Sequence, residues 1–291
     1  MAAAGHELTP GEYIRHHLVH LNNSGHKQES IVDFSIINLD SVIFSAALGA
    51  LVCFFLWRAA SKASAGAPGR FQAAVEILFE MVDNQAKSVI HNANSRKLVA
   101  PLALVVFCWI FMMNFMDMLP VDLLPGIWHK AGPAMGLPHY LRVVPTADLS
   151  TTLGLSLSVL VLCLIYNVKI KGLGGWAHEL VSAPFGTSKN PLFAVLLGVV
   201  NFAMQMIEFV AKTVSHGMRL FGNMFAGELV FMLIALLGGF AAFSLSGGLF
   251  FVGHIIAGTV WTIFHILVIT LQAFIFMMLA LIYLGQAHDA H

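Results

Sequence analysis

The chain is built from long apolar runs separated by shorter polar segments. An α-helix needs about 20 apolar residues to cross a bilayer upright. Two stretches near the end of the chain, 191–246 and 248–284, are far longer than this, and a glycine-rich break separates them. We therefore expect an all-α integral membrane protein with about five to six membrane helices, the last two forming a long, strongly tilted hairpin over about 191–285. Three runs have the length of one upright span: 38–57, 98–118 and 149–168.

The segment between the first two spans, residues 58–97, has a different periodicity. Charged residues recur in it at spacings of 4, 3 and 4, while apolar residues occupy another face. This pattern predicts an amphipathic helix over about 70–90 that lies on the membrane surface or against a partner protein. Residues 1–38 are polar and rich in histidine. We expect them to form an outer-side segment, followed by a single polytopic membrane domain over 39–291.

Composition narrows the class of protein. Of the 291 residues, 58% are hydrophobic and 10% are charged, which indicates a membrane protein rather than a soluble enzyme. The formal net charge is zero, so nothing suggests binding to nucleic acid. Cys53, Cys108 and Cys163 lie inside apolar runs without the spacing of metal ligands, so we expect neither a metal site nor disulfides. The sequence gives no reason to expect a cofactor.

Basic residues are distributed unevenly over the connecting segments. Six lie in 58–97 and three in 169–189, against two in the loop between the second and third spans. Basic residues accumulate on the cytoplasmic side of membrane proteins. We therefore expect the N-terminus on the outer, periplasmic side and the C-terminus in the cytoplasm.

The first helix of the expected hairpin carries a single polar stripe. A helix turns about 100° per residue, so residues spaced 3, 4, 7 and 11 apart share a face. Arg219 is the member set most deeply in apolar sequence, where an arginine costs on the order of a few kcal/mol unless it faces a polar cavity or a charged partner. Glu208 and Glu228 are poorly placed to hold it, so we expect its partner on another chain. The stripe comprises Gln205, Glu208, Lys212, Ser215, Arg219 and Asn223.

The last helix carries a second stripe, in which His254, His265 and Gln272 follow at spacings of 11 and 7. Titratable groups in apolar membrane sequence are functional candidates, because the membrane makes them expensive. His265 is aligned with Gln272 and lies opposite a helix that carries Glu228, which favours a function. A structural histidine that only packs in the bundle is the alternative, and for His254 that alternative is favoured.

Four motifs carry a resemblance to a known family. Arg219-Leu-Phe-Gly-Asn223-Met, followed by Ala-Gly-Glu228, is similar to the core motif of subunit a of F-type ATP synthases. The run from Phe264 through His265 and Gln272 resembles the final helix of that family. Leu119-Pro-Val-Asp122-Leu-Leu-Pro and Val144-Pro-Thr-Ala-Asp148 match as well, so the resemblance covers most of the chain and is weakest in the first 35 residues.

The resemblance implies a non-catalytic stator subunit in a bacterial inner membrane, with the ATP chemistry on other subunits. Its implied partners are the ring of c subunits, the peripheral-stalk subunit b, the rest of the synthase and membrane lipid. Arg219 would separate two aqueous half-channels that deliver protons to, and remove them from, the ring carboxylates. The implied outer half-channel uses Glu228, His265, Gln272 and Asn223, with Asp117 and Asp122 as further candidates, and the inner one uses Glu208, Gln205 and Ser215.

The sequence departs from the family at one site position. Many relatives carry a glutamate fourteen residues before the motif arginine, and this chain has Gln205 there and a glutamate three residues later, at Glu208. We predict that Glu208 has taken over the inner relay. The alternative is that Glu208 only forms an i,i+4 ion pair with Lys212.

Two other classes of protein can be weighed against this interpretation. A stand-alone transporter or channel often contains internal repeats, and the sequence shows none. A haem-binding redox subunit would account for the 14 histidines, but bis-histidine ligation needs facing pairs at membrane depth, and most of these histidines lie in loops or tails.

Overall fold

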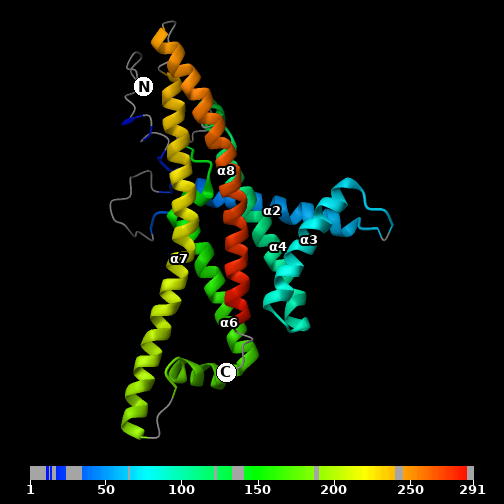
Figure 1. Ribbon diagram of the computed structural model, residues 1–291, viewed down its shortest axis with the longest axis vertical. Coiled ribbons are helices and arrows are strands. Elements are labelled where there is room, and N and C mark those ends of the chain that lie inside the picture. Colours follow the sequence, from blue (N-terminus) through cyan, green and yellow to red (C-terminus); the bar gives the residue numbers. More distant parts are fainter. Residues whose placement is uncertain are drawn as a thin grey trace. The chain divides into compact units, whose positions relative to one another are not determined.

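A computed structural model describes most of the chain, and every regular element in the described part is helical (Figure 1). Outside the helices, the described residues include one isolated antiparallel bridge, between Asn22 and Asn38. The described residues are 11–12, 14, 18–23, 35–64, 66–120, 123–132, 141–186, 190–239 and 245–286.

Five of the described helices are long and apolar enough to cross a membrane, which confirms the predicted all-α membrane fold. The short amphipathic helix is also present, within one residue of its predicted end, although its position relative to a membrane stays a prediction. The α-helices are α2 (Leu39–Ser61), α3 (Arg70–Val89), α4 (Ala93–Phe115), α5 (Leu123–Ala131), α6 (Leu149–Ser182), α7 (Pro191–Gly239) and α8 (Leu245–Gln286). Two short 3-10 turns, η1 (Met116–Met118) and η3 (Pro145–Ala147), accompany them.

The last two helices have the lengths expected of the hairpin. α7 contains 49 residues and α8 contains 42. At a rise of about 1.5 Å per residue, α7 is roughly 74 Å long, more than twice the ~30 Å of a bilayer's hydrocarbon core. A helix of this length has to tilt strongly or extend beyond the membrane.

The chain divides into two compact units, and most of the long helices contribute residues to both. For this reason the single membrane domain expected over 39–291 stays a prediction. Unit 1 comprises Met1–Phe55, Cys108–Thr151 and Phe221–Ala273, and unit 2 comprises Leu56–Phe107, Thr152–Leu220 and Phe274–His291.

In unit 1, hydrogen bonds join neighbouring helices. The indole of Trp109 on α4 donates to the main-chain oxygen of Ser45 on α2 over 2.8 Å. His254 on α8 lies with Nδ1 2.7 Å from the main-chain oxygen of Ile234 on α7. The C-terminal part of α7 therefore packs against the N-terminal part of α8, as in an antiparallel hairpin.

Unit 2 is held by close contacts between α6, α7 and α8. The thiol of Cys163 on α6 donates to the main-chain oxygen of Tyr283 on α8 over 3.1 Å. α7 approaches α6 at Gly217, where a side chain would begin 2.9 Å from the hydroxyl oxygen of Ser156. α3 contributes Val82 and Ala86, both fully buried.

Two elements differ from the prediction. The third span was expected to end near Val168, but α6 continues to Ser182 through a break at Gly172, whose φ of 73° is a conformation that favours glycine. The predicted loop after the second span contains the nine-residue helix α5. Pro125 occupies the first turn of α5, a position that tolerates proline because its missing N–H would have no partner there.

Candidate functional site

In unit 1, a buried ion pair joins α7 to the segment that precedes η3. Glu228 on α7 and Arg142 are 7% and 6% exposed. The guanidinium of Arg142 binds the carboxylate through two nitrogens: Nε donates to Oε1 over 3.3 Å, and Nη2 donates to Oε2. A bidentate pair of this kind fixes the geometry of both side chains. The charge of Glu228 is thus balanced within this chain.

Arg142 is itself held by the N-terminal part of unit 1. Its Nη1 lies 2.8 Å from Nε2 of His20, and its main-chain N–H donates to Oδ2 of Asp40 over 3.2 Å. Asp40 also accepts the main-chain N–H of Leu21 over 3.0 Å. A buried carboxylate at the start of α2 therefore connects the N-terminal segment to the residue that binds Glu228.

His265 and Asp117 form a second buried pair in unit 1. Nε2 of His265 lies 2.7 Å from Oδ2 of Asp117, an ion-pair distance, although these two atoms do not meet hydrogen-bond geometry. The imidazole packs against the rings of Phe231 and Trp261, with centroids 5.2 and 5.9 Å away. α7 presents Gly227 to the imidazole, and a side chain there would overlap Cε1 of His265.

Two further predicted residues of unit 1 contact each other. Nδ2 of Asn223 on α7 donates to Oε1 of Gln272 on α8 over 2.7 Å, and Gln272 is buried.

A cavity of about 40 Å³, large enough for on the order of a few water molecules, is lined by both Asp117 and the Arg142–Glu228 pair. The residues predicted for the outer half-channel thus lie within one unit, except Asp122, which falls outside the described residues.

The role of Arg142 was not predicted from the sequence, where it counted only as one of two basic residues in a loop. Its partner Glu228 is 86 residues away, so no local periodicity connects the two. The available signal was the carboxylate itself, because a buried charge in a membrane helix requires a partner.

Replacing Arg142 with glutamine should destabilise the protein, because it leaves the buried carboxylate of Glu228 without a cation. Breaking a buried pair from one side typically costs about 3–5 kcal/mol. We expect the melting temperature of the purified complex to fall by several degrees, and the double variant Arg142→Gln/Glu228→Gln to recover most of the loss.

The control is the exposed i,i+4 pair of α3, in which Nζ of Lys87 lies 2.6 Å from Oδ2 of Asp83. A solvated pair contributes at most about 1 kcal/mol, so Lys87→Gln should leave the melting temperature nearly unchanged. An Arg142→Gln protein as stable as this control would contradict the role given to the buried pair.

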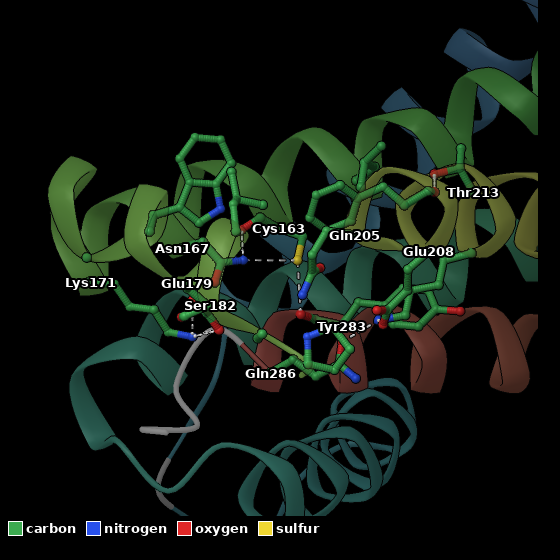
Figure 2. Close-up of a pocket in the computed structure, with 18 of the residues that line it drawn as sticks. Cys163, Asn167, Lys171, Glu179, Ser182, Gln205, Glu208, Thr213, Tyr283 and Gln286 are labelled. Carbon is green, nitrogen blue, oxygen red and sulfur yellow. Dashed lines mark hydrogen bonds and ion pairs between the residues drawn. The ribbon is translucent and has the colours of Figure 1, made fainter. Parts of the chain in front are cut away.

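Unit 2 contains a cavity of about 1080 Å³ between α6, α7 and the end of α8. Figure 2 shows Gln205 and Glu208 on the wall of this cavity, together with Cys163 and Asn167. Further along α6, Nζ of Lys171 lies 2.8 Å from both carboxylate oxygens of Glu179. Most of the polar groups that line the cavity come from α6 and α7. Such a lining suits water and hydrated ions better than an apolar ligand.

Glu208 is part of a polar chain on the wall of this cavity. Its Oε1 lies 2.5 Å from Nζ of Lys212, which also donates to Oε1 of Gln286 over 2.8 Å. The Lys212 ammonium lies 5.3 Å from the centre of the Tyr283 ring. Glu208 therefore pairs with Lys212 and also lines the cavity, as Gln205 does. The relay role and the alternative of a simple ion pair both stay predictions.

Arg219 and Ser215 have a different setting on α7. Both side chains are exposed, and neither lines the cavity. Arg219 makes no hydrogen bond or ion pair with any residue in the described part of the chain. An exposed guanidinium in an apolar helix is available to a partner on another chain.

Several cavity-lining residues were not predicted from the sequence, among them the histidine that lies nearest to Arg219. His216 is buried, lies next to Ser215 and faces the cavity. The polar stripe was assigned to Ser215, which lies four residues before Arg219. His216 lies three residues before Arg219, a spacing that also falls on the same face of a helix, and it was left out of the stripe. Among the described residues, no group of three or more histidine, cysteine or acidic side chains is arranged to hold a metal ion.

Comparison with known proteins gives a consistent result along the whole chain. The family described as ATP synthase A chain matches residues 42–285. The chain is 74% identical over 294 residues to ATP synthase subunit a of Paracidovorax citrulli (strain AAC00-1), covering all of both chains. It is 72% identical over 292 residues to the Acidovorax sp. (strain JS42) protein of the same name, again with full coverage. It is 44% identical over 295 residues to ATP synthase subunit a of Psychrobacter arcticus, covering 97% of each.

Proposed function

Since the chain belongs to the ATP synthase A chain family, the membrane subunit a of the Fo sector, we propose that it supplies two separate proton paths to a rotating ring of carboxylate-bearing c subunits. Arg219 separates the two paths. The subunit itself carries out no ATP chemistry.

The outer path uses the polar residues of unit 1. The buried contacts between Asp117 and His265 and between Asn223 and Gln272 supply groups that can exchange protons or order water. Glu228 borders the same small cavity as Asp117. These contacts support a path that reaches the ring from the periplasmic side.

The inner path uses the cavity of unit 2. Gln205 and Glu208 line a space large enough for many water molecules, and the side chain of Glu208 is half exposed. A water-filled space needs only one or two fixed groups to carry protons to the cytoplasm. This arrangement supports the prediction that Glu208 acts in place of the glutamate found at position 205 in relatives.

The observation that carries the proposal is the setting of Arg219. Along the continuous helix α7, the cavity-lining residues precede Arg219, and Asn223 and Glu228 follow it. Its guanidinium is exposed and has no counter-ion among the described residues. An uncompensated cation on an apolar surface is suited to bind an ionised carboxylate of a neighbouring subunit.

Charge then explains how proton flow turns the ring. A ring carboxylate that faces lipid must be protonated, because an ionised group in hydrocarbon is too costly. Beside Arg219 the ionised form is favoured, so each carboxylate releases its proton into one path there. It then takes a proton from the other path and carries it through nearly a full turn of the ring before the next release. The membrane potential contributes about 2.3 kcal/mol per charge per 100 mV.

The proposal includes an orientation and a set of partners. Basic residues favour a periplasmic N-terminus and a cytoplasmic C-terminus in a bacterial inner membrane. The partners are the c ring, the peripheral-stalk subunit b and the remainder of the synthase.

Cysteine labelling tests the two paths and the orientation together. In a variant without Cys53, Cys108 and Cys163, single cysteines are placed at positions 272 and 205. Small charged thiol reagents should modify position 272 from the periplasmic face and position 205 from the cytoplasmic face.

The labelling control is a cysteine at position 157 on α6, which is occupied by an exposed leucine. It faces lipid in this proposal and should stay unmodified. Equal labelling of positions 272 and 205 from one face, or no labelling of either, would contradict two separate aqueous paths.

The inner relay can be tested with a charge moved by one turn. Glu208→Gln should lower ATP-driven proton pumping several-fold, and adding Gln205→Glu should restore it, because both side chains face one cavity. If Glu208 only pairs with Lys212, Glu208→Gln should instead reduce assembly, and Lys212→Gln should relieve the defect. Pumping is measured in inverted vesicles, with Glu80→Gln on the exposed face of α3 as control. Normal pumping and assembly in Glu208→Gln would contradict both roles.

A further inference from the structure

His216 is a buried histidine that lines the cavity of unit 2 and has one ring nitrogen without a hydrogen-bond partner among the described residues. The residue is 2% exposed and lines the 1080 Å³ cavity of unit 2. Its Nε2 has no hydrogen-bond partner in the described part of the chain. Buried polar atoms are nearly always paired with protein or water, so an unpaired nitrogen on a residue that lines this cavity stands out as a group that could take up a proton or bind a water molecule.

Aromatic side chains of α8 fix the orientation of this ring. The ring centre of Phe276 lies 3.8 Å from that of His216, and the ring centre of Tyr283 lies 5.9 Å away. On the side of α6, the close approach of Gly217 to Ser156 restricts the space around the helix. These contacts restrict the rotation of the His216 ring.

Charged groups lie on either side of His216 along α7. Lys212 and Glu208 precede it by one and two turns and face the same cavity. Arg219 follows three residues later, about 4.5 Å further along the helix axis. From the other helices, the charged and polar groups on this wall include Cys163, Asn167, His178 and the Lys171–Glu179 ion pair of α6, and Tyr283 and Gln286 of α8. His216 is the residue of this wall that lies closest in sequence to Arg219.

We propose that His216 is the last proton carrier of the inner path, and this inference rests on the function proposed above. A proton released by a ring carboxylate beside Arg219 binds one imidazole nitrogen. The imidazolium then releases a proton from its other nitrogen to water in the cavity, which restores the neutral ring. The direction reverses when ATP hydrolysis drives pumping. Imidazole suits this step because it donates at one nitrogen and accepts at the other.

The first test replaces His216 with phenylalanine, which keeps an aromatic ring between Phe276 and α6 but removes both nitrogens. We expect ATP-driven pumping in inverted vesicles to fall about tenfold or more, as for the loss of a proton-transfer group, while the complex still assembles. The control is His91→Phe, which changes an exposed histidine outside the cavity. Wild-type pumping in His216→Phe would overturn the proposal.

The second test separates proton transfer from packing. His216→Ala should pump poorly, and added imidazole should restore part of the rate by occupying the space of the lost ring. Because imidazole dissipates pH gradients, the readout is the membrane potential, corrected with wild-type vesicles that receive the same imidazole. A defect that imidazole leaves unchanged, or a failure of both variants to assemble, would mark His216 as a packing residue and overturn the proposal.

Arg219→Ala, measured in parallel, distinguishes this inference from the proposed function. If Arg219→Ala pumps normally, the half-channel function fails and the role of His216 fails with it. If Arg219→Ala is inactive while His216→Phe pumps normally, only the role of His216 is wrong.

Discussion

Replacing Arg219 with alanine or glutamine is expected to abolish proton-driven ATP synthesis while the complex still assembles. Assembly should persist because Arg219 is exposed and pairs with no described residue, so its loss leaves no buried group unpaired. Synthesis should stop because nothing then favours the ionised ring carboxylate at the junction of the two paths. Arg219→Lys should also be severely impaired, because lysine can lose its proton in a dry site and lacks the planar guanidinium.

The measurement is ATP synthesis by vesicles energised with an imposed proton gradient. Arg58→Ala provides a matched control, since Arg58 is an exposed arginine near the end of an apolar helix. Synthesis at control rates in Arg219→Ala would remove the basis of the proposed function.

The second large effect is expected at the Asp117–His265 pair. Asp117→Asn or His265→Gln alone should lower pumping at least tenfold and also reduce stability, because each removes one member of a buried polar pair whose atoms lie 2.7 Å apart and leaves the other without its contact. The double variant Asp117→Asn/His265→Gln has two neutral side chains at this position. It should regain stability without regaining pumping, since neither amide exchanges protons readily.

Melting temperature and pumping are measured on the same four proteins, the wild type included. A structural pair would give parallel recovery of both quantities in the double variant, and that result would contradict a role in proton transfer. His254, whose ring contacts the main chain of Ile234 instead of a charged group, offers a control: His254→Gln should affect pumping far less than His265→Gln.

The spacing of polar and apolar residues predicted the bounds of the amphipathic helix well. The charges of α3 repeat at helical spacing, and the helix was found at Arg70–Val89 against a prediction of about 70–90. At α6, the third span was predicted to end near Val168, beside Lys169 and Lys171, and the helix breaks directly after them, at Gly172. The second helical segment, which follows the break and ends at Ser182, was not predicted.

Within the candidate site, helical spacing found the groups but not their partners. The stripe correctly brought Gln205 and Glu208 to one surface, which turned out to line a cavity. Contacts such as Arg142 with Glu228, or His265 with Asp117, join residues that are distant in the chain and depend on the packing of several helices. His216 was missed because two neighbouring positions of a helix both lie near the same face, and only packing shows which of them faces inward.

The contact between Gly227 and His265 has a consequence for how this protein can vary among species. Because the imidazole fills the space where a side chain at position 227 would begin, the two positions cannot change independently. A larger residue at position 227 requires a smaller or displaced side chain at position 265. Asp117 would then lose its contact with the imidazole and need another polar partner. We therefore expect the effects of substitutions at these two positions to be coupled.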